Sequence, residues 1–428
     1  MRIALMTNNY KPIVAGVPIS IERLAKGLEE LGHEVTIFAP TYKERQTMRQ
    51  LTGRRAAGKW RFEAVHAQTG SERGGEEENV FRYSTCLNRF VGGIVLPNPF
   101  DIRIEREFKE HCYDIIHVHH PMLIGRTAVH LSRKYQIPLV FTYHTRYEHY
   151  ITSYTKGIVR VNRLMPFYLR TFLRHCHFVF APTEGMREYL TDVCGIRPEK
   201  TGILPTGIEK RNFDIEPEAG MGIRRQYGAE HIPFLLTVSR MANEKNVKFL
   251  LESLKRVKEL YGKPFRMLMV GDGPDRKELE RRSRELGLEE NVIFAGTVPN
   301  EEIAPYFKAA DAFLFASKTE TQGIVVLEAF AGAAPVIAVK ASGVEDLVDD
   351  GVNGILTGED TEEYARAVTG FLNGTQMLPC SKMAENALQK AALYREEAVA
   401  LKAVHYYNSV IAENETHKKR NIRLLPAG

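Results

Sequence analysis

One stretch of the chain is decisive for the fold, Ala312-Phe-Leu-Phe-Ala-Ser-Lys-Thr-Glu-Thr-Gln-Gly-Ile-Val-Val-Leu-Glu-Ala-Phe-Ala331. Its first five residues form an apolar run that is typical of a buried strand, and the residues after Gly323 favour a helix. Thr319 to Gly323 is therefore predicted to be a strand-to-helix turn. In an α/β sheet such a turn lies at the carboxyl end of the strand, where ligands bind.

Two carboxylates flank this turn: Glu320 lies in the loop and Glu328 in the predicted helix. The free backbone amides at the start of a helix attract phosphate, and carboxylates accept hydrogen bonds from sugar hydroxyls. This layout suits a ligand that carries both a diphosphate and many hydroxyls. Taken alone, it fits equally well a capping acid followed by a solvated helix acid.

Length and composition indicate a soluble globular protein of two to three domains, with 428 residues, 44% hydrophobic and 26% charged. The cysteines are odd in number and lack C-x-x-C spacing, so they indicate neither a disulfide framework nor a zinc site. They fit a reducing cytosol. No segment approaches the roughly 18 consecutive apolar residues that span a bilayer. We therefore expect a cytoplasmic protein, and the net charge of +5 permits a local basic patch.

The first part of the chain alternates apolar strands with helices. Arg2–Met6, a helix with apolar residues at helical spacing from Ile21 to Leu31, and a strand from Glu34 to Ala39 form a β-α-β opening, which predicts a parallel sheet. Residues 52–79 lack periodicity and are predicted to form surface excursions between strands. Further strands are predicted at 114–118, 138–142, 178–181 and 201–204.

The alternation restarts after the charged segment 212–231, with strands predicted at 233–238, 265–270, 292–295, 312–316, 335–339 and 354–357. We therefore expect an α/β protein with two Rossmann-like doubly wound domains, 1–208 and 209–390, facing each other across a cleft. A last helical stretch is predicted from Ser381 to Ala412, with a loose basic tail at Lys418–Arg420. Residues 391–428 are expected to pack back on the first domain.

The strand ends of the second domain carry groups that a nucleotide-diphosphate ligand requires. Arg240 and Lys245 follow its first strand, where a bidentate guanidinium and an ammonium can clamp a diphosphate and stabilise it as a leaving group. Gly271-Asp-Gly273-Pro allows a base or ribose to approach the backbone closely. Each of these features alone could be a solvated helix start or a turn. Their occurrence at successive strand ends favours a nucleotide site.

Together, Glu320-x7-Glu328, Arg240-x4-Lys245 and Gly271-Asp-Gly-Pro resemble the retaining glycosyltransferases of family 4, which have the GT-B fold. The resemblance covers nearly the whole chain. It implies that Arg240 and Lys245 bind the diphosphate of a UDP-sugar donor. The remaining implied donor contacts are Glu328 to the ribose, Glu320 and the amides of Thr321, Gln322, Gly323 and Ile324 to the sugar, and Gly271, Gly273 and Val298 to the base.

In the first domain, the resemblance implies that His119 faces the sugar and that the Gly16 loop closes over the donor phosphates. A row of histidines, His117, His119 and His120, could also suggest a metal. On a strand His117 and His119 share one face while His120 points away, and no further ligand is spaced to complete a site. There is also no Asp-x-Asp motif. We therefore expect no metal and no cofactor, with Arg240 and Lys245 providing the charge stabilisation.

The acceptor side is similar to the diacylglycerol glucosyltransferase branch of the family in Phe141-Thr-Tyr-His-Thr-Arg-Tyr-Glu-His-Tyr150 and Thr319-Glu-Thr-Gln-Gly323. The acceptor candidates are His144, Tyr147 and Glu148. The segment after them interleaves apolar residues with Lys156, Arg160, Arg163, Arg170 and Arg174, with no acid among them. Such a surface can lie on anionic lipid headgroups, each charge contributing about 1 kcal/mol. Alternatively it is an ordinary domain helix, since Pro166 interrupts one long amphipathic helix.

Three functional hypotheses follow. The first is a transferase that moves a hexose, glucose above all, from a UDP-sugar to a lipid such as diacylglycerol, peripherally on the inner face of the membrane. The second is a related enzyme with a soluble acceptor, such as a sugar, a sugar phosphate or an inositol phosphate. The third is a non-catalytic binding protein with basic patches for nucleic acid. Nucleic acid is not expected as a partner, because aromatic and basic residues are interleaved in only one stretch and the sequence contains no nucleic-acid module. The oligomeric state is not determined by the sequence.

Overall fold

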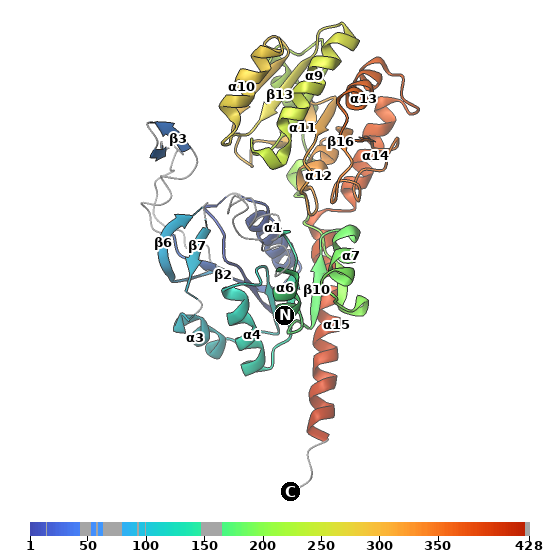
Figure 1. The fold of residues 1–428 in the computed structure, drawn as a ribbon. Coiled ribbons are helices and arrows are strands. Elements are labelled where there is room, and N and C mark those ends of the chain that lie inside the picture. The colour runs from blue at the N-terminus through green and yellow to red at the C-terminus, as the bar shows by residue number, and fades with distance from the viewer. Residues whose placement is uncertain are drawn as a thin grey trace. The chain divides into compact units, whose positions relative to one another are not determined.

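The computed structural model describes residues 1–13, 15–42, 53–56, 59–62, 79–91, 94–98, 100–146 and 165–423. They form two compact units (Figure 1). Unit 1 comprises Met1–Gly207 with Glu396–Gly428, and unit 2 comprises Ile208–Arg395. The sequence placed the boundaries at 208 and 390. The second boundary lies later because Ile208 N–H donates to Tyr394 O at 2.7 Å, which keeps residues up to Arg395 with unit 2.

Unit 1 is built on a seven-stranded parallel sheet in the order β11-β10-β9-β8-β1-β2-β5. Its strands are β1 (Arg2–Met6), β2 (Glu34–Pro40), β5 (Val80–Tyr83), β8 (Ile115–Val118), β9 (Leu139–Thr142), β10 (Phe178–Ala181) and β11 (Thr201–Ile203). The strand order reverses at β1, which pairs with both β2 and β8. The helices are α1 (Gly16–Glu30), α3 (Ile102–Glu110), α4 (Ile124–Tyr135), α6 (Met165–Leu173) and α7 (Glu184–Asp192), with the 3-10 turn η2 (Pro198–Lys200).

Two antiparallel hairpins in unit 1 were not predicted. One pairs β3 (Gly53–Ala56) with β4 (Lys59–Phe62), inside the segment that the sequence assigned to surface excursions. The other pairs β6 (Thr85–Val91) with β7 (Ile94–Pro97). The rest of the predicted excursion, residues 63–78 above all, lies outside the described residues.

Unit 2 is built on a six-stranded parallel sheet in the order β14-β13-β12-β15-β16-β17, and the order reverses at β12, which pairs with both β13 and β15. Its strands are β12 (Phe234–Val238), β13 (Arg266–Val270), β14 (Val292–Gly296), β15 (Ala312–Phe315), β16 (Val336–Val339) and β17 (Gly354–Thr357). Its helices are α8 (Pro217–Gln226), α9 (Val247–Tyr261), α10 (Arg276–Glu285), α11 (Ala304–Ala309), α12 (Ile324–Ala331), α13 (Thr361–Asn373) and α14 (Cys380–Ala392), with 3-10 turns η3 (Lys210–Asn212) and η4 (Asn243–Lys245).

In both units helices cover both faces of the sheet, so each unit has two hydrophobic clusters, one on each face. In unit 2 one cluster includes Phe313 and Phe330, and the other includes Leu314 and Tyr364. Successive residues of β15 therefore pack on opposite faces, as expected for a strand covered on both sides. This confirms the predicted doubly wound α/β architecture.

The C-terminal prediction was wrong in two respects. The helical stretch expected from Ser381 to Ala412 is broken at Leu393–Arg395, between α14 and α15 (Glu396–Arg423). The basic segment expected to be loose, Lys418–Arg420, is part of α15. Helix α15 packs on α1 of unit 1, where Ala400 Cβ would lie 2.8 Å from a Cβ on Gly27. No helix in the described part of the chain is long and apolar enough to cross a membrane.

Candidate active site

The predicted diphosphate-binding residues of unit 2 lie at the point where the strand order reverses. Arg240 follows β12, Glu320 follows the neighbouring strand β15, and Lys245 ends the 3-10 turn η4. Lys245 Nζ lies 2.5 Å from Glu320 Oε1. In open parallel sheets, ligands bind beside the carboxyl ends of the strands at this reversal. The structure therefore brings together three of the four residues that the sequence selected as catalytic candidates.

Each of the two basic residues has a carboxylate partner. Arg240 Nη2 donates to Glu244 Oε1 at 2.6 Å, an ion pair that the sequence analysis missed. Burial acts to raise the pKa of Glu320, but the charge and hydrogen bond of Lys245 outweigh it, so this pKa lies below its ordinary value. Burial acts in the same way on Glu244, but the hydrogen bond and charge of Arg240, a backbone hydrogen bond and the charge of Lys245 together lower its pKa. Both carboxylates are therefore ionised at neutral pH.

The glycine loop after β13 braces the segment that carries Arg240. A Cβ on Gly271, which has φ +128°, would lie 2.0 Å from Ser239 O, and one on Gly273 would lie 2.2 Å from Met241 O. Met241 N–H also donates to Asp272 O at 2.9 Å. Glycine is therefore required at both positions, because the backbone of residues 239–241 lies where a Cβ would be. Their predicted contact with a base or ribose stays a prediction.

The end of β14 is joined to the same loop, because Gly271 N–H donates to Gly296 O at 2.7 Å. Gly296 has φ +79°, a backbone conformation that glycine adopts without strain. Val298, predicted to contact the base, follows two residues later and is half-buried. The ends of β12, β13 and β14 are thus linked through their backbones.

The turn between β15 and α12 has the form that the sequence predicted. Gly323 has φ +77° and immediately precedes α12, whose first amides have no partner within the helix itself. Gln322 and Glu328 are buried, while Thr321 and Ile324 are half-buried. The backbone of Gly343 packs directly against this turn, since a Cβ added to Gly343 would lie 2.7 Å from Glu320 O.

In unit 1, the predicted sugar-facing residue His119 belongs to a stack of imidazoles at the end of β8. Its ring lies 4.3 Å from that of His117 and 5.1 Å from that of His144, centroid to centroid. His119 Nδ1 shares a hydrogen bond of 2.8 Å with His144 Nε2. His119 Nε2 is buried and has no hydrogen-bond partner among the described residues. The sequence assigned His144 to the acceptor; the structure places it against His119.

The sequence did not reveal the hydrogen-bond partners of the other two histidines in the cluster, His117 and His120. His117 is held by two hydroxyls, with Nδ1 2.6 Å from Tyr407 Oη on α15 and Nε2 2.6 Å from Thr142 Oγ1. His120 Nδ1 accepts a hydrogen bond from Asn8 N–H, at the end of the adjacent strand β1, at 3.2 Å. No periodicity or motif in the sequence marks Tyr407 or Asn8.

Burial keeps this histidine cluster neutral. It lowers the pKa of His120 to about 4 and that of His144 to about 3, and it holds the pKa values of His117 and His119 well below the ordinary range. A neutral imidazole carries a single N–H, so one nitrogen of each ring is an acceptor. In the described part of the chain, these histidines do not form a group with metal-binding geometry.

The remaining first-domain candidates are dispersed. Gly16 begins α1 and is exposed, and its N-cap residue Ala15 makes no side-chain cap. Arg170 and Arg174 are exposed on and just after α6. The other acceptor or membrane candidates lie outside the described residues: Tyr147, Glu148, Lys156, Arg160 and Arg163.

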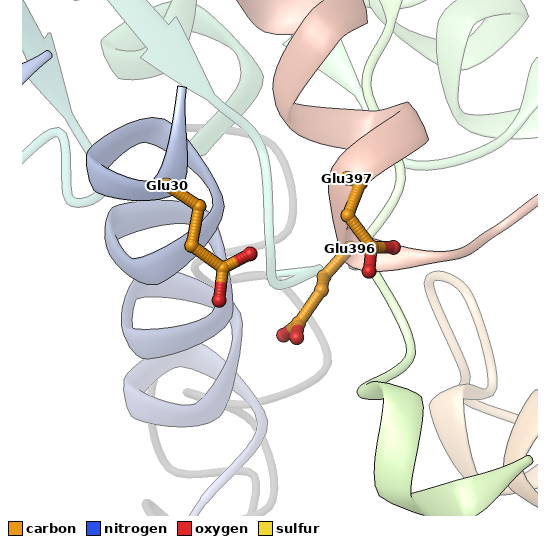
Figure 2. A group of neighbouring side chains, drawn as sticks. All are labelled: Glu30, Glu396 and Glu397. Atoms are coloured by element: carbon orange, nitrogen blue, oxygen red, sulfur yellow. The ribbon is translucent and has the colours of Figure 1, made fainter. Parts of the chain in front are cut away.

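Two other features of unit 1 do not resemble active sites. Glu30, Glu396 and Glu397 bring their carboxylates together (Figure 2), but Lys26 Nζ already lies 2.7 Å from Glu396 Oε1 and 3.9 Å from Glu30 Oε1. A hollow of about 870 Å³ lies at the amino-terminal ends of β1, β2 and β5. Among the groups that line it, Arg2 pairs with Glu34 and His111 with Glu107.

Comparisons with known proteins agree with this geometry. Residues 14–211 match the family model "Glycosyltransferase Family 4", and residues 223–390 match "Glycosyl transferases group 1". The chain is 31% identical over 360 residues to an α-monoglucosyldiacylglycerol synthase of Streptococcus pneumoniae, covering 83% of this chain and 75% of that one. It is 27% identical to an enzyme of the same name from Acholeplasma laidlawii, covering 98% and 100%.

Solved structures support the same fold. HepE of Anabaena, in complex with UDP, superposes with a TM-score of 0.71 at 20% identity, covering 96% of this chain and 100% of that one. Sucrose-phosphate synthase of Thermosynechococcus elongatus gives a TM-score of 0.72 at 19% identity, covering 96% and 99%. The expected fold is thereby confirmed, and the identity and coverage of the relatives show that this chain belongs to glycosyltransferase family 4, with the GT-B fold.

Proposed function

We propose that this glycosyltransferase moves a hexose, glucose above all, from a UDP-sugar to a lipid acceptor such as diacylglycerol at an anionic membrane surface. The observation that carries the proposal is the arrangement of Arg240, Lys245 and Glu320 at the strand reversal of unit 2, with Lys245 Nζ 2.5 Å from Glu320 Oε1. It offers two cations to a diphosphate and a carboxylate to sugar hydroxyls. The names of the relatives from Streptococcus pneumoniae and Acholeplasma laidlawii support glucose and diacylglycerol.

Donor binding follows from the chemistry of the strand ends. The Arg240 guanidinium and the Lys245 ammonium bind the two phosphates, and the first amides of α12 add hydrogen bonds to an anion. Glu328, buried in α12, accepts from the ribose hydroxyls. UDP is favoured as the nucleotide because HepE of Anabaena has been solved in complex with UDP and with UDP-glucose.

The transfer proceeds with retention and without a metal ion. The bond between the sugar C1 and the phosphate oxygen breaks, and the acceptor oxygen forms a bond to C1 on the same face. The proton of the acceptor hydroxyl passes to the departing phosphate oxygen. Arg240 and Lys245 stabilise the charge that develops on the diphosphate, and in this role positioned cations are worth several kcal/mol. Neutral His119 contacts a sugar hydroxyl.

The membrane part of the proposal is supported by the surface formed by α4 and α6. These helices pack together where Gly125 meets Phe172. Their exposed side chains include Phe167, which is 72% exposed, and the arginines Arg126, Arg133, Arg170 and Arg174. Between Ile115 and Thr183 the sequence contains a single acidic residue, Glu148. Basic residues around an exposed aromatic side chain favour anionic lipid headgroups, which are characteristic of the cytoplasmic leaflet.

A transfer assay tests the proposal. The protein is incubated with UDP-glucose, UDP-galactose or GDP-mannose, each with vesicles that contain diacylglycerol and phosphatidylglycerol, with and without EDTA. We expect an α-linked glucosyl lipid from UDP-glucose, and the same rate with EDTA present. Transfer to a sugar phosphate or inositol phosphate with none to vesicles would instead assign the soluble acceptor.

A variant and a matched control test whether Arg240 contributes to the rate of transfer. Arg240→Ala is expected to lower kcat/KM about 100-fold to 1,000-fold, the range for a positioned charge that stabilises a leaving group. Arg282→Ala is the control, because Arg282 pairs with Glu252 on the helices α9 and α10. Unchanged turnover in Arg240→Ala would remove Arg240 from the mechanism.

A further inference from the structure

Four charged side chains at the ends of β12 and β15 form two ion pairs, and the Asp275 carboxylate lies within electrostatic range of Arg240 and Glu244. Arg240 is paired with Glu244, and Lys245 is paired with Glu320. The two pairs lie close together, since the charge of Glu244 acts on Glu320 and the charge of Lys245 acts on Glu244. Each cation that the proposed function assigns to the diphosphate therefore already holds a carboxylate.

An incoming nucleoside diphosphate changes this balance. It brings at least two negative charges to the same guanidinium and ammonium that the carboxylates occupy. Like charges held within a few ångströms of one another in a partly buried site repel strongly. One carboxylate must therefore move away when the diphosphate binds, or the ligand binds weakly.

The geometry indicates which carboxylate moves. The Glu320 side chain is 17% exposed, and the turn that carries it is packed against Gly343. The Glu244 side chain is 33% exposed and lies on the one-turn 3-10 segment η4, next to Arg240, which is itself 53% exposed. Glu244 can rotate into solvent at low cost, whereas Glu320 is held where the sugar is expected.

We propose that Glu244 is an internal competitor of the diphosphate. It neutralises Arg240 in the empty protein, gives way when the donor binds, and returns to Arg240 as the nucleoside diphosphate product leaves. This inference rests on the proposed function, because it requires a diphosphate at Arg240. Its consequence is that Glu244 weakens the binding of product and speeds its release.

The opposite role for Glu244 has a different signature. If the carboxylate served to orient Arg240 for the ligand, its removal would loosen the guanidinium and weaken nucleotide binding. If it competes, its removal strengthens binding. The direction of the change in Kd therefore distinguishes competition from orientation.

The test measures UDP and GDP binding to the full chain by isothermal titration calorimetry. Glu244→Gln removes the charge and keeps an amide oxygen that can accept from Arg240. For whichever of the two nucleotides the wild-type protein binds, we expect the Kd of Glu244→Gln to be about threefold to tenfold lower. This is the change expected for the loss of one nearby like charge in a partly screened site. The gain should shrink at high salt, where surface charges are screened.

The matched control is Glu252→Gln. Glu252 is also paired with an arginine at 2.6 Å, and its side chain is 29% exposed, but it lies on α9 against Arg282 of α10. The Kd of Glu252→Gln should equal that of wild type. This variant changes the overall charge as much as Glu244→Gln does, but it leaves the local charge at Arg240 unchanged. Circular dichroism verifies that both variants are folded.

Two results would overturn the inference. A Kd that is unchanged or raised in folded Glu244→Gln, with nucleotide binding intact in wild type, contradicts competition and leaves the proposed function standing. Wild-type protein that binds neither UDP nor GDP contradicts the proposed function, and the inference fails with it.

Discussion

Tyr407 Oη lies 2.6 Å from His117 Nδ1, a buried hydrogen bond that joins α15, near the end of the chain, to the sheet that carries the histidine cluster. His117 makes its second hydrogen bond to Thr142, also at 2.6 Å. Both partners are hydroxyls, which donate or accept, so the neutral ring is satisfied whichever nitrogen carries its proton. The C-terminal helix is thereby part of the support beneath His119.

Tyr407→Phe tests the contribution of this hydrogen bond to stability. The substitution keeps the ring and leaves His117 Nδ1 without its partner in a buried site, so we expect the free energy of unfolding to fall by about 1–3 kcal/mol. Urea unfolding followed by circular dichroism measures it. Tyr406→Phe is the control, since this neighbouring ring packs on the rings of Phe178 and Phe180, contacts that phenylalanine keeps. Equal losses in the two variants would contradict a special role for the Tyr407 hydroxyl.

The histidine cluster is expected to make unit 1 sensitive to acid. Burial lowers the pKa of all four members, His117, His119, His120 and His144. Below the ordinary histidine pKa of about 6.5, the unfolded chain therefore binds more protons than the folded one, and stability decreases as the pH falls. At pH 5, each histidine should lower the free energy of unfolding by about 2 kcal/mol relative to neutral pH, as long as its pKa in the folded protein lies below this pH.

Hydrogen exchange resolved by peptide, and corrected for the intrinsic rate at each pH, measures this effect. Unit 2 is the internal reference, because its one histidine, His231, is exposed. We expect protection in β8 and β9 to fall between pH 6.5 and pH 5 while that in β12 and β15 is retained. Loss of protection in unit 2 first would show that the histidines do not limit acid stability.

Gly271→Ala tests the bracing of the Arg240 segment. The new Cβ would meet Ser239 O at 2.0 Å in a backbone with φ +128°, so strain and overpacking should together cost about 2–4 kcal/mol. Gly287→Ala is the control, because Gly287 also has a positive φ, +66°, and a Cβ added there would have no heavy atom within 4 Å; about 1 kcal/mol is expected there. Urea unfolding gives the stabilities, and calorimetry with UDP should show weaker binding to folded Gly271→Ala. Similar losses in both glycine variants would contradict the bracing role.

The sequence predicted the parts of this fold that depend on local pattern. Apolar runs located every strand of both large sheets except β5 to within one or two residues, since a strand that is buried on both faces has few polar positions. Strand β5 (Val80–Tyr83), at the edge of the first sheet and carrying Arg82, was not predicted. The turn before α12 was found because Gly323 and the change of periodicity coincide. The roles proposed for Arg240, Lys245 and Glu328 come from the family resemblance, and the positions of Arg240 and Lys245 after the first strand of the second domain agree with it.

What the sequence did not predict depends on contacts between distant residues. The break at Leu393–Arg395 has no proline or glycine; it occurs where the chain leaves unit 2 for unit 1. Tyr407 and His117 are 290 residues apart, and nothing local marks either as the partner of the other. Glu244, between two selected residues, had the appearance of an ordinary acid in a helix start. Its pairing with Arg240 required the conformation of η4.

The α4–α6 surface provides the last prediction, because the membrane attachment proposed there rests on charge. Arg170→Glu combined with Arg174→Glu reverses two charges near the headgroups, and each basic residue is worth about 1 kcal/mol at an anionic surface. We expect binding to vesicles that contain phosphatidylglycerol to weaken by at least about 30-fold, and binding to pure phosphatidylcholine vesicles to change little. Co-sedimentation at two salt concentrations measures both. Lys277→Glu with Arg284→Glu is the control, since these residues are exposed on α10 of unit 2 and the net charge changes equally. If this control loses binding as strongly, the attraction is a property of the whole protein and the α4–α6 surface is not the attachment site.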